Sequence, residues 1–407
     1  MPSGSASGTE ELLIAMQTPA PRGHLGVPTL LWGQPGEGKT SFVESLDRPG
    51  FPVVTLIASI HDPTDFSGLP VYEQQRMRFA PPEWTTLFDD PQEGILFLDE
   101  LTTAPPAVQA ALLRIVLERK VGIQSLPERV RIVAAANPPE DIVGGWELSP
   151  PLANRFVHIR WKLSGIALAE SFQDGFARPE LPAIDPDEHR EAAGMWRLKT
   201  AAFLRRDPTL VHTVPAEREY AFASPRTWDF AVQLMASCEL LGKAAQPGKR
   251  ASTVFYNLLE GAIGSGAARS FTGYLKDLCV PNPDRVLDGK ESVHLESLKD
   301  DELYILFCSL CTGVANRRRQ LTATRFLKAT MILLSLIEDV DAAGRVDTVF
   351  APVRQLVRGQ LLQHAASAAQ NARMLGEYEA LVHRLFDDTA LSEYVRLLTT
   401  PPDPGNK

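Results

Sequence analysis

The chain has 407 residues, a length typical of two or three domains; 44% of the residues are hydrophobic and 22% are charged. These near-average fractions exclude a disordered polymer and a fibrous repeat. Lys and Arg number 41 against 50 Asp and Glu, and the net charge of −9 weakens the electrostatic case for duplex nucleic acid or an anionic membrane as a partner.

The amino-terminal sequence and the cysteines indicate a reducing compartment. The start of the chain lacks the basic and apolar segments of a secretory signal, and we expect residues 1–8 to be flexible. The strongest apolar run, Met331–Ile337, is far shorter than the ~20 residues of a membrane helix. Cys308 and Cys311 form a lone C-x-x-C in an apolar helical run, which favours packing over zinc binding. We therefore expect a cytoplasmic protein without membrane insertion.

Short β-rich runs alternate with helical stretches in the first part of the chain. The runs are apolar on both faces, which is typical of a parallel sheet covered by crossover helices. We expect an α/β domain over residues 9–165 with a parallel five-stranded sheet between helices. Its strands would come from five segments: Val27–Trp32, Phe51–Ala58, Gly94–Glu100, Arg131–Asn137 and Phe156–Trp161.

The composition changes after this domain. A Pro-rich and acidic stretch predicts an insertion or linker over residues 166–222, followed by a helical domain at 223–280. A further helical region is expected at 295–399. Its helices would span residues 300–314, 322–339, 349–368 and 372–386.

The segment between the first strand and the next helix matches G-x-x-x-x-G-K-[ST] in full. Glycines let the backbone N–H groups of such a loop point at phosphate oxygens. Lys39 would reach the β- and γ-phosphates, and Thr40 would bind Mg²⁺. The alternative is a Gly/Pro turn that fits by coincidence. The predicted phosphate-binding residues are Gly33, Gln34, Pro35, Gly36, Glu37, Gly38, Lys39, Thr40 and Ser41.

Two further strands end in polar residues. Asp99 and Glu100 close a buried strand, at the sheet edge where open α/β folds bind ligands. Asp99 would hold Mg²⁺ and Glu100 would polarise the attacking water; the alternative is that both only favour the start of the next helix. Asn137 could orient that water, or it could simply begin the turn before Pro138.

The order of these motifs, followed by Leu152–Phe156 and Ala223–Arg226, resembles the AAA+ ATPases and, within them, the MoxR family. The resemblance covers residues 27–278. The segment His61–Val71 looks like the helix-two insertion of that clade, with Arg78–Trp84 closing its hairpin. The resemblance implies an α/β P-loop NTPase core, an α-helical lid and a further α-helical carboxy-terminal region.

The resemblance also carries roles to particular residues. Asn137 takes the position of sensor one, Arg155 that of the arginine finger acting on a neighbouring subunit, and Arg226 that of sensor two on the lid. A plain surface arginine is the alternative for both Arg155 and Arg226. Asn154 stands where MoxR proteins usually carry Asp, which affects the salt bridge that would orient the finger.

The implied activity is hydrolysis of ATP with Mg²⁺ in a homo-oligomeric ring, expected to be a hexamer, that remodels a protein client. The expected client is a protein with a von Willebrand factor A domain. Two alternatives remain open: an ATP-dependent scaffold with little turnover, and an AAA+ protein acting on DNA, which the net charge of −9 disfavours.

Overall fold

The computed structural model describes residues 6–73, 76–138, 146–176, 178–214, 219–245, 251–320, 322–371, 374–386 and 391. The chain divides into two compact units. The first comprises Met1–Thr200 and Asp207–Lys276, and the second comprises Ala201–Arg206 and Asp277–Lys407.

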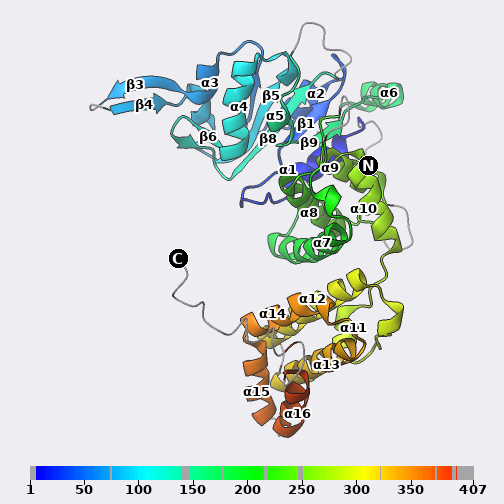
Figure 1. The fold of residues 1–407 in the computed structure, drawn as a ribbon. Coiled ribbons are helices and arrows are strands. Elements are labelled where there is room, and N and C mark those ends of the chain that lie inside the picture. Colours follow the sequence, from blue (N-terminus) through cyan, green and yellow to red (C-terminus); the bar gives the residue numbers. More distant parts are fainter. Residues whose placement is uncertain are drawn as a thin grey trace. The chain divides into compact units, whose positions relative to one another are not determined.

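The first unit is built on a five-stranded parallel sheet with the strand order β2-β5-β8-β1-β9 (Figure 1). All five predicted strands are confirmed. Because neighbouring strands are parallel and in register, with Trp32 opposite both Ala136 and Arg160, their carboxyl ends meet at one edge. The strands are β1 (Thr29–Trp32), β2 (Val53–Ile57), β5 (Glu93–Asp99), β8 (Arg129–Ala136) and β9 (Val157–Arg160).

Helices bury both faces of this sheet, as the apolar strands predicted. On one face, Leu96 and Leu98 share a core with α4 (Pro106–Glu118) and the short helices α3 (Pro63–Ser67) and α5 (Pro150–Ala153). On the other face, Phe97 and Val133 share a core with α1 (Thr9–Gln17) and α2 (Lys39–Glu44). The alternation of β-strand side chains divides the two cores.

Two small hairpins lie outside the main sheet. Strands β3 (Leu69–Glu73) and β4 (Arg76–Ala80) pair antiparallel in the segment expected to be an insertion. The second hairpin pairs β6 (Lys120–Val121) with β7 (Gln124–Ser125). Short 3₁₀ turns lie nearby at η1 (Glu83–Phe88) and η2 (Leu101–Thr103).

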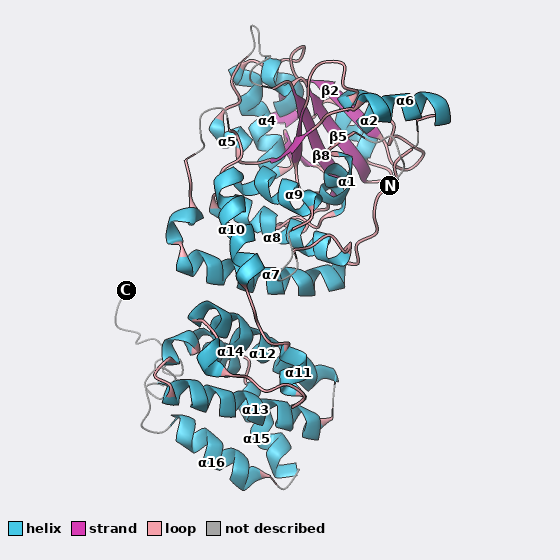
Figure 2. Cartoon of the chain, turned by 90° about the vertical axis from the view of Figure 1, so that its right-hand side faces the viewer, coloured by secondary structure: helices cyan, strands magenta, loops and turns pink. Residues whose placement is uncertain are grey.

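The segment expected to be an insertion or linker contains ordered helices. These are α6 (Gly165–Asp174) and α7 (Pro186–Arg206), followed by the turn η4 (Pro208–Val211). The helical lid follows as α8 (Pro225–Leu240), α9 (Thr253–Ile263) and α10 (Ser265–Asp277), as Figure 2 shows. At the amino end, the Ser7 N–H donates to the Lys162 carbonyl at 2.9 Å, whereas residues 1–5 lie outside the described residues.

The second unit is helical and has its own apolar core, in which Phe307, Leu333 and Val353 are fully buried. The expected helix over residues 349–368 is wrong, because Gln360 adopts a left-handed φ of 52° and divides it. The elements are α11 (Pro283–Leu287), η5 (Leu295–Ser297), α12 (Asp300–Gln320), α13 (Ala323–Ala342), η6 (Val346–Thr348), α14 (Phe350–Arg358), α15 (Leu361–Asn371) and α16 (Leu375–Phe386). Residues 387–390 and 392–399 of the expected region lie outside the described residues.

Cys308 and Cys311 are free and buried in this second core. Burial raises the pKa of the Cys308 thiol to about 11, and it raises the pKa of Cys311 well above its usual value. Both thiols are therefore protonated at neutral pH, which suits a packing role. Within the described ranges, no helix is long and apolar enough to cross a membrane.

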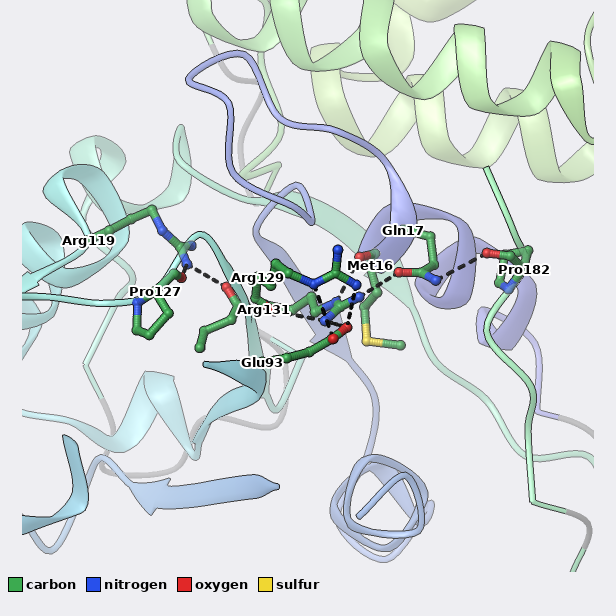
Figure 3. A network of polar contacts seen from close by, with 9 residues as sticks. Met16, Gln17, Glu93, Arg119, Pro127, Arg129, Arg131 and Pro182 are labelled. Carbon is green, nitrogen blue, oxygen red and sulfur yellow. Dashed lines mark hydrogen bonds and ion pairs between the residues drawn. The ribbon is translucent and has the colours of Figure 1, made fainter. Parts of the chain in front are cut away.

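A buried arginine fastens α1 to the amino edge of the sheet (Figure 3). The side chain of Arg131 on β8 is 2% exposed and donates to Glu93 Oε1 at 2.7 Å. It also donates to Gln17 Oε1 at 2.7 Å and to the Met16 carbonyl at 3.3 Å. These bonds compensate the loss of hydration of the guanidinium, so removal of one partner is expected to destabilise the unit.

Replacing Glu93 with Gln should lower the free energy of unfolding at pH 7 by about 2 kcal/mol, because it leaves the buried Arg131 without its anion. Partial burial raises the pKa of Glu93, but hydrogen bonds from Arg129 and Arg131 outweigh this effect and lower the pKa below 4.5. The stabilisation is thus complete above the unfolded-state pKa and is lost as pH falls through the folded-state pKa. Urea unfolding from pH 3 to 7 checks this, with the exposed Glu118→Gln as control; a wild-type advantage independent of pH would contradict it.

Candidate functional site

Three of the predicted motifs meet at the carboxyl edge of the sheet. Strand β1 ends at Trp32 directly before the glycine loop, and β5 ends at Asp99. Asn137 follows the end of β8, which lies between β5 and β1 in the strand order. Residues more than 90 positions apart in the sequence are therefore brought to one site, which the sheet topology explains.

The glycine loop has the backbone conformation that the motif requires. Gly36 and Gly38 have φ angles of +84° and +75°, in the left-handed region that favours glycine. A Cβ at Gly33 would lie 2.7 Å from the Trp161 carbonyl, so this position leaves no space for a side chain. The Trp161 indole N–H donates to the Glu37 carbonyl at 3.0 Å and holds the loop against β9. Trp161 was not among the predicted site residues.

Lys39 is the first residue of α2, at the end of the loop, and is 8% exposed. Its ammonium donates to the carbonyls of Gly33 and Gln34, and to Asn137 Oδ1 at 3.4 Å. Burial lowers the pKa of Lys39, while the charges of Asp99 and Glu37 raise it. The lysine is thus bonded to groups that a bound phosphate can replace, since phosphate oxygens are stronger acceptors than neutral carbonyls.

The loop also contains an internal carboxylate. The Gln34 N–H donates to Glu37 Oε2 at 2.9 Å, so one backbone donor already binds an anion. Pro35 lies at the exposed turn of the loop, and Ser41 lies on the first turn of α2. These positions place the whole predicted segment Gly33–Ser41 around one backbone cradle.

Thr40 and Asp99 form a pair of oxygen donors beside Lys39. The Thr40 hydroxyl donates to Asp99 Oδ2 at 2.6 Å, and Asp99 Oδ1 accepts the Glu100 N–H at 2.9 Å. Mg²⁺ prefers one or two protein oxygens together with phosphate oxygens and water. Thr40 and Asp99 fit that ion, and among the described residues no group of three or more His, Cys, Asp or Glu forms an alternative metal site.

Glu100 is exposed at the turn after β5 and has a left-handed φ of 55°. Its Oε2 accepts a hydrogen bond from the Ser59 hydroxyl at 2.7 Å. Ser59 follows β2, whose last residue, Ile57, lies opposite Asp99. Sequence reasoning missed Ser59 because only the pairing of β2 with β5 brings it to Glu100.

Two cavities open on the loop. One, of about 590 Å³, lies between the sheet and the lid and is lined by Gln34, Glu37, Pro138 and lid residues such as Gly261. The other, of about 1020 Å³, lies beside α1 and α2 and has an apolar lining that includes Phe42. The Glu37 and Trp161 side of the loop borders both cavities.

An aromatic stack connects the loop to the segment before the lid. Trp32 and Tyr220 lie parallel with ring centroids 4.9 Å apart. The Trp32 indole N–H donates to His158 Nδ1 at 2.9 Å, and His158 Nε2 bonds to the Ala153 carbonyl at 3.1 Å. Burial lowers the pKa of His158 to about 4, so the ring is neutral at pH 7 and accepts the Trp32 bond.

Arg155 and Arg226 lie together, and neither is among the described residues that line the two cavities. Arg155 donates to the Pro151 carbonyl, and Arg226 donates to Asn154 Oδ1 at 3.3 Å. Burial lowers the pKa of Arg155, and the nearby charge of Arg226 lowers it further. The structure thus brings these two arginines together at the start of α8, beside Asn154.

Comparison with known proteins agrees with this geometry. Residues 28–156 match the profile of the AAA domain, dynein-related subfamily. This segment belongs to the AAA+ ATPases. The AAA+ segment is 34% identical over 143 residues to the Psp operon transcriptional activator of Escherichia coli, covering 33% of this chain and 43% of that protein. It is 32% identical over 137 residues to the chaperone MoxR1 of Mycobacterium tuberculosis, covering 32% of this chain and 33% of that protein.

The match to MoxR1 confirms the predicted resemblance to MoxR-type AAA+ ATPases. The chain spans less than half the length of either curated relative. A crystal structure from Cytophaga hutchinsonii, described provisionally as an ATPase, aligns with a TM-score of 0.40 and 17% identity over 64% of this chain and 82% of that chain.

Proposed function

We propose that this AAA+ chain binds ATP with Mg²⁺ and hydrolyses the ATP in a ring of identical subunits, expected to be a hexamer, in order to remodel a protein client. The observation that supports hydrolysis best is the convergence of Lys39, Thr40, Asp99 and Glu100 at one sheet edge. Phosphoryl transfer needs groups in these positions more than it needs covalent catalysis.

Each of these residues has a distinct role in the proposal. Lys39 turns from its carbonyl partners to the β- and γ-phosphates, while ATP lies between the α/β core and the lid. Thr40 and Asp99 would hold Mg²⁺, and the bound ion would supply positive charge to balance the negative charge that develops on the phosphate. Glu100, released from Ser59, accepts a hydrogen bond from the attacking water. Asn137 orients that water from the neighbouring strand.

In a ring, the neighbouring subunit would supply further positive charge to the γ-phosphate. The MoxR resemblance gives Arg155 the role of an arginine finger at the γ-phosphate of an adjacent subunit, and its position beside Arg226 concentrates positive charge there. Arg226 on α8 is proposed to act with it. Residues 223–280 would form the lid, and residues 295–399 would select the client in the cytoplasm. The MoxR resemblance favours a client with a von Willebrand factor A domain.

ATP hydrolysis measured against protein concentration, with mass photometry on the same samples, tests the proposal. Turnover per subunit should rise as rings form, since a monomer holds only part of each site. Assembly with ATP but without turnover, in the presence and absence of client, would contradict the motor and favour the scaffold. Turnover stimulated by DNA would favour the DNA-acting alternative.

Subunits carrying Arg155→Ala should be inactive alone and should recover turnover when mixed with inactive Glu100→Gln subunits. In the mixed ring, some interfaces combine an intact Glu100 with an intact Arg155 from the next subunit. About a quarter of the interfaces in an equal random mixture would be complete if the finger acts between subunits. Steady-state turnover of preassembled mixtures checks this. Mixed rings without recovery, with their assembly confirmed, would show that Arg155 does not act in this way.

A further inference from the structure

Asn154 is a buried core residue whose side chain holds the start of lid helix α8. It is 8% exposed and follows helix α5 directly. Its Oδ1 accepts the Ser224 hydroxyl at 2.9 Å and an Arg226 N–H at 3.3 Å, while its Nδ2 donates to the Phe222 carbonyl at 3.4 Å. One amide therefore contacts three successive parts of the lid junction.

Ser224 links Asn154 to the amino-terminal cap of α8. It caps α8, and its side chain accepts the Thr227 N–H while its hydroxyl donates to Asn154. A shift of the lid would therefore break the contact of Asn154 with the helix cap and its contact with Arg226 together. Because Arg226 lies on the first turn of α8, its position depends on this docking.

Arg155 follows Asn154 directly and lies near Arg226. The Nη1 of Arg155 donates to the Pro151 carbonyl, and its Nε is buried with no hydrogen-bond partner among the described residues. Burial lowers the pKa of both Arg155 and Arg226, and the charge of Arg22 lowers each further. A cluster of guanidinium groups with an unused donor is suited to an external anion.

We propose that Asn154 is a positioning residue that couples the lid of one subunit to the phosphate of the nucleotide bound by the next. When α8 docks on Asn154, Arg226 lies beside Arg155 and the two form one phosphate-binding pair. When α8 moves away, the pair separates. This inference rests on the proposed shared-site ring, and it adds a route by which the lid of one subunit controls hydrolysis in its neighbour.

Asn154→Ala should lower kcat about tenfold or more with little change in the KM for ATP, because its own Lys39 site is intact and only the arginine pair is misplaced. Asn154→Asp keeps an acceptor for Ser224 and Arg226, and it should retain at least about half of the wild-type kcat. Ser237→Ala is the matched control, since it removes the buried 2.8 Å bond from Thr18 to the same helix without touching the arginines. Should Asn154→Ala fail to fold, Asn154→Leu replaces it with a side chain of similar volume.

Mixed rings of two variants distinguish an effect of Asn154 on the neighbouring subunit from an effect on the nucleotide site of its own subunit. Asn154→Ala subunits mixed with Glu100→Gln subunits should recover turnover, because the Glu100→Gln subunit contributes an intact arginine pair. If Asn154→Ala behaves like Ser237→Ala, raises KM alone, or does not recover on mixing while Arg155→Ala does, the role of Asn154 is wrong. If Arg155→Ala also fails to recover in assembled mixtures, the shared-site function itself is overturned.

Discussion

Lys39→Ala should reduce ATP affinity at least about 100-fold, to below detection by calorimetry. The buried ammonium donates hydrogen bonds to the Gly33 and Gln34 carbonyls of the glycine loop and to Asn137 Oδ1. A charge-assisted bond to phosphate contributes about 1.5–3 kcal/mol, and the lysine reaches two phosphates. Loss of both contacts therefore removes most of the anchoring energy.

Calorimetric titration with ATP and Mg²⁺ measures this effect. Lys276→Ala, which removes an exposed lysine on the lid helix α10, is the matched control and should bind as the wild type does. Lys39→Met keeps much of the buried volume and should lose binding equally, which separates lost charge from lost packing. Wild-type affinity in folded Lys39→Ala would refute the assignment of the glycine loop.

Glu100→Gln should lower turnover about 100- to 1000-fold while ATP still binds, a loss in the range expected for a general base. The substitution keeps the side-chain shape and an oxygen that can accept the Ser59 hydrogen bond, which is 2.7 Å long in the structure. Because Lys39, Thr40 and Asp99 are unchanged, affinity should remain within about threefold of wild type. The nucleotide is then trapped, and the assembled state should accumulate.

Steady-state turnover, calorimetry and mass photometry on the same samples test this expectation. Glu118→Gln is the control, because this exposed residue at the end of α4 is ion-paired only with Arg114 among the described residues. Unchanged turnover would remove Glu100 from the mechanism. Lost ATP binding would instead assign Glu100 to the binding of the substrate.

Local signals in the sequence were sufficient to predict several elements of the site. The segment Ile95–Glu100 is apolar and ends in two acids, so its strand and the position of its carboxylates could be predicted from the pattern alone. The same holds for the glycine loop before α2. By contrast, the break between α14 and α15 lies at Gly359–Gln360, where one residue in the left-handed region ends an otherwise continuous helical pattern.

The contacts between motifs required the tertiary structure. Ser59 carries no motif and reaches Glu100 only because β2 pairs with β5. Trp161 looked like the end of an apolar strand, yet it fastens the glycine loop through Glu37. Asn154 stood out only as a departure from the MoxR pattern, and its three lid partners lie 68 to 72 positions away.

The sequence by itself determined the strands, the phosphate-binding loop and the identities of the acidic residues, because glycine geometry, apolar periodicity and strand ends are local properties. Only the tertiary structure decided which of these groups touch, and that Arg155 and Arg226 lie together beside Asn154. The physical reason is that strand order and lid docking depend on the burial of side chains distant in sequence, which no local pattern encodes.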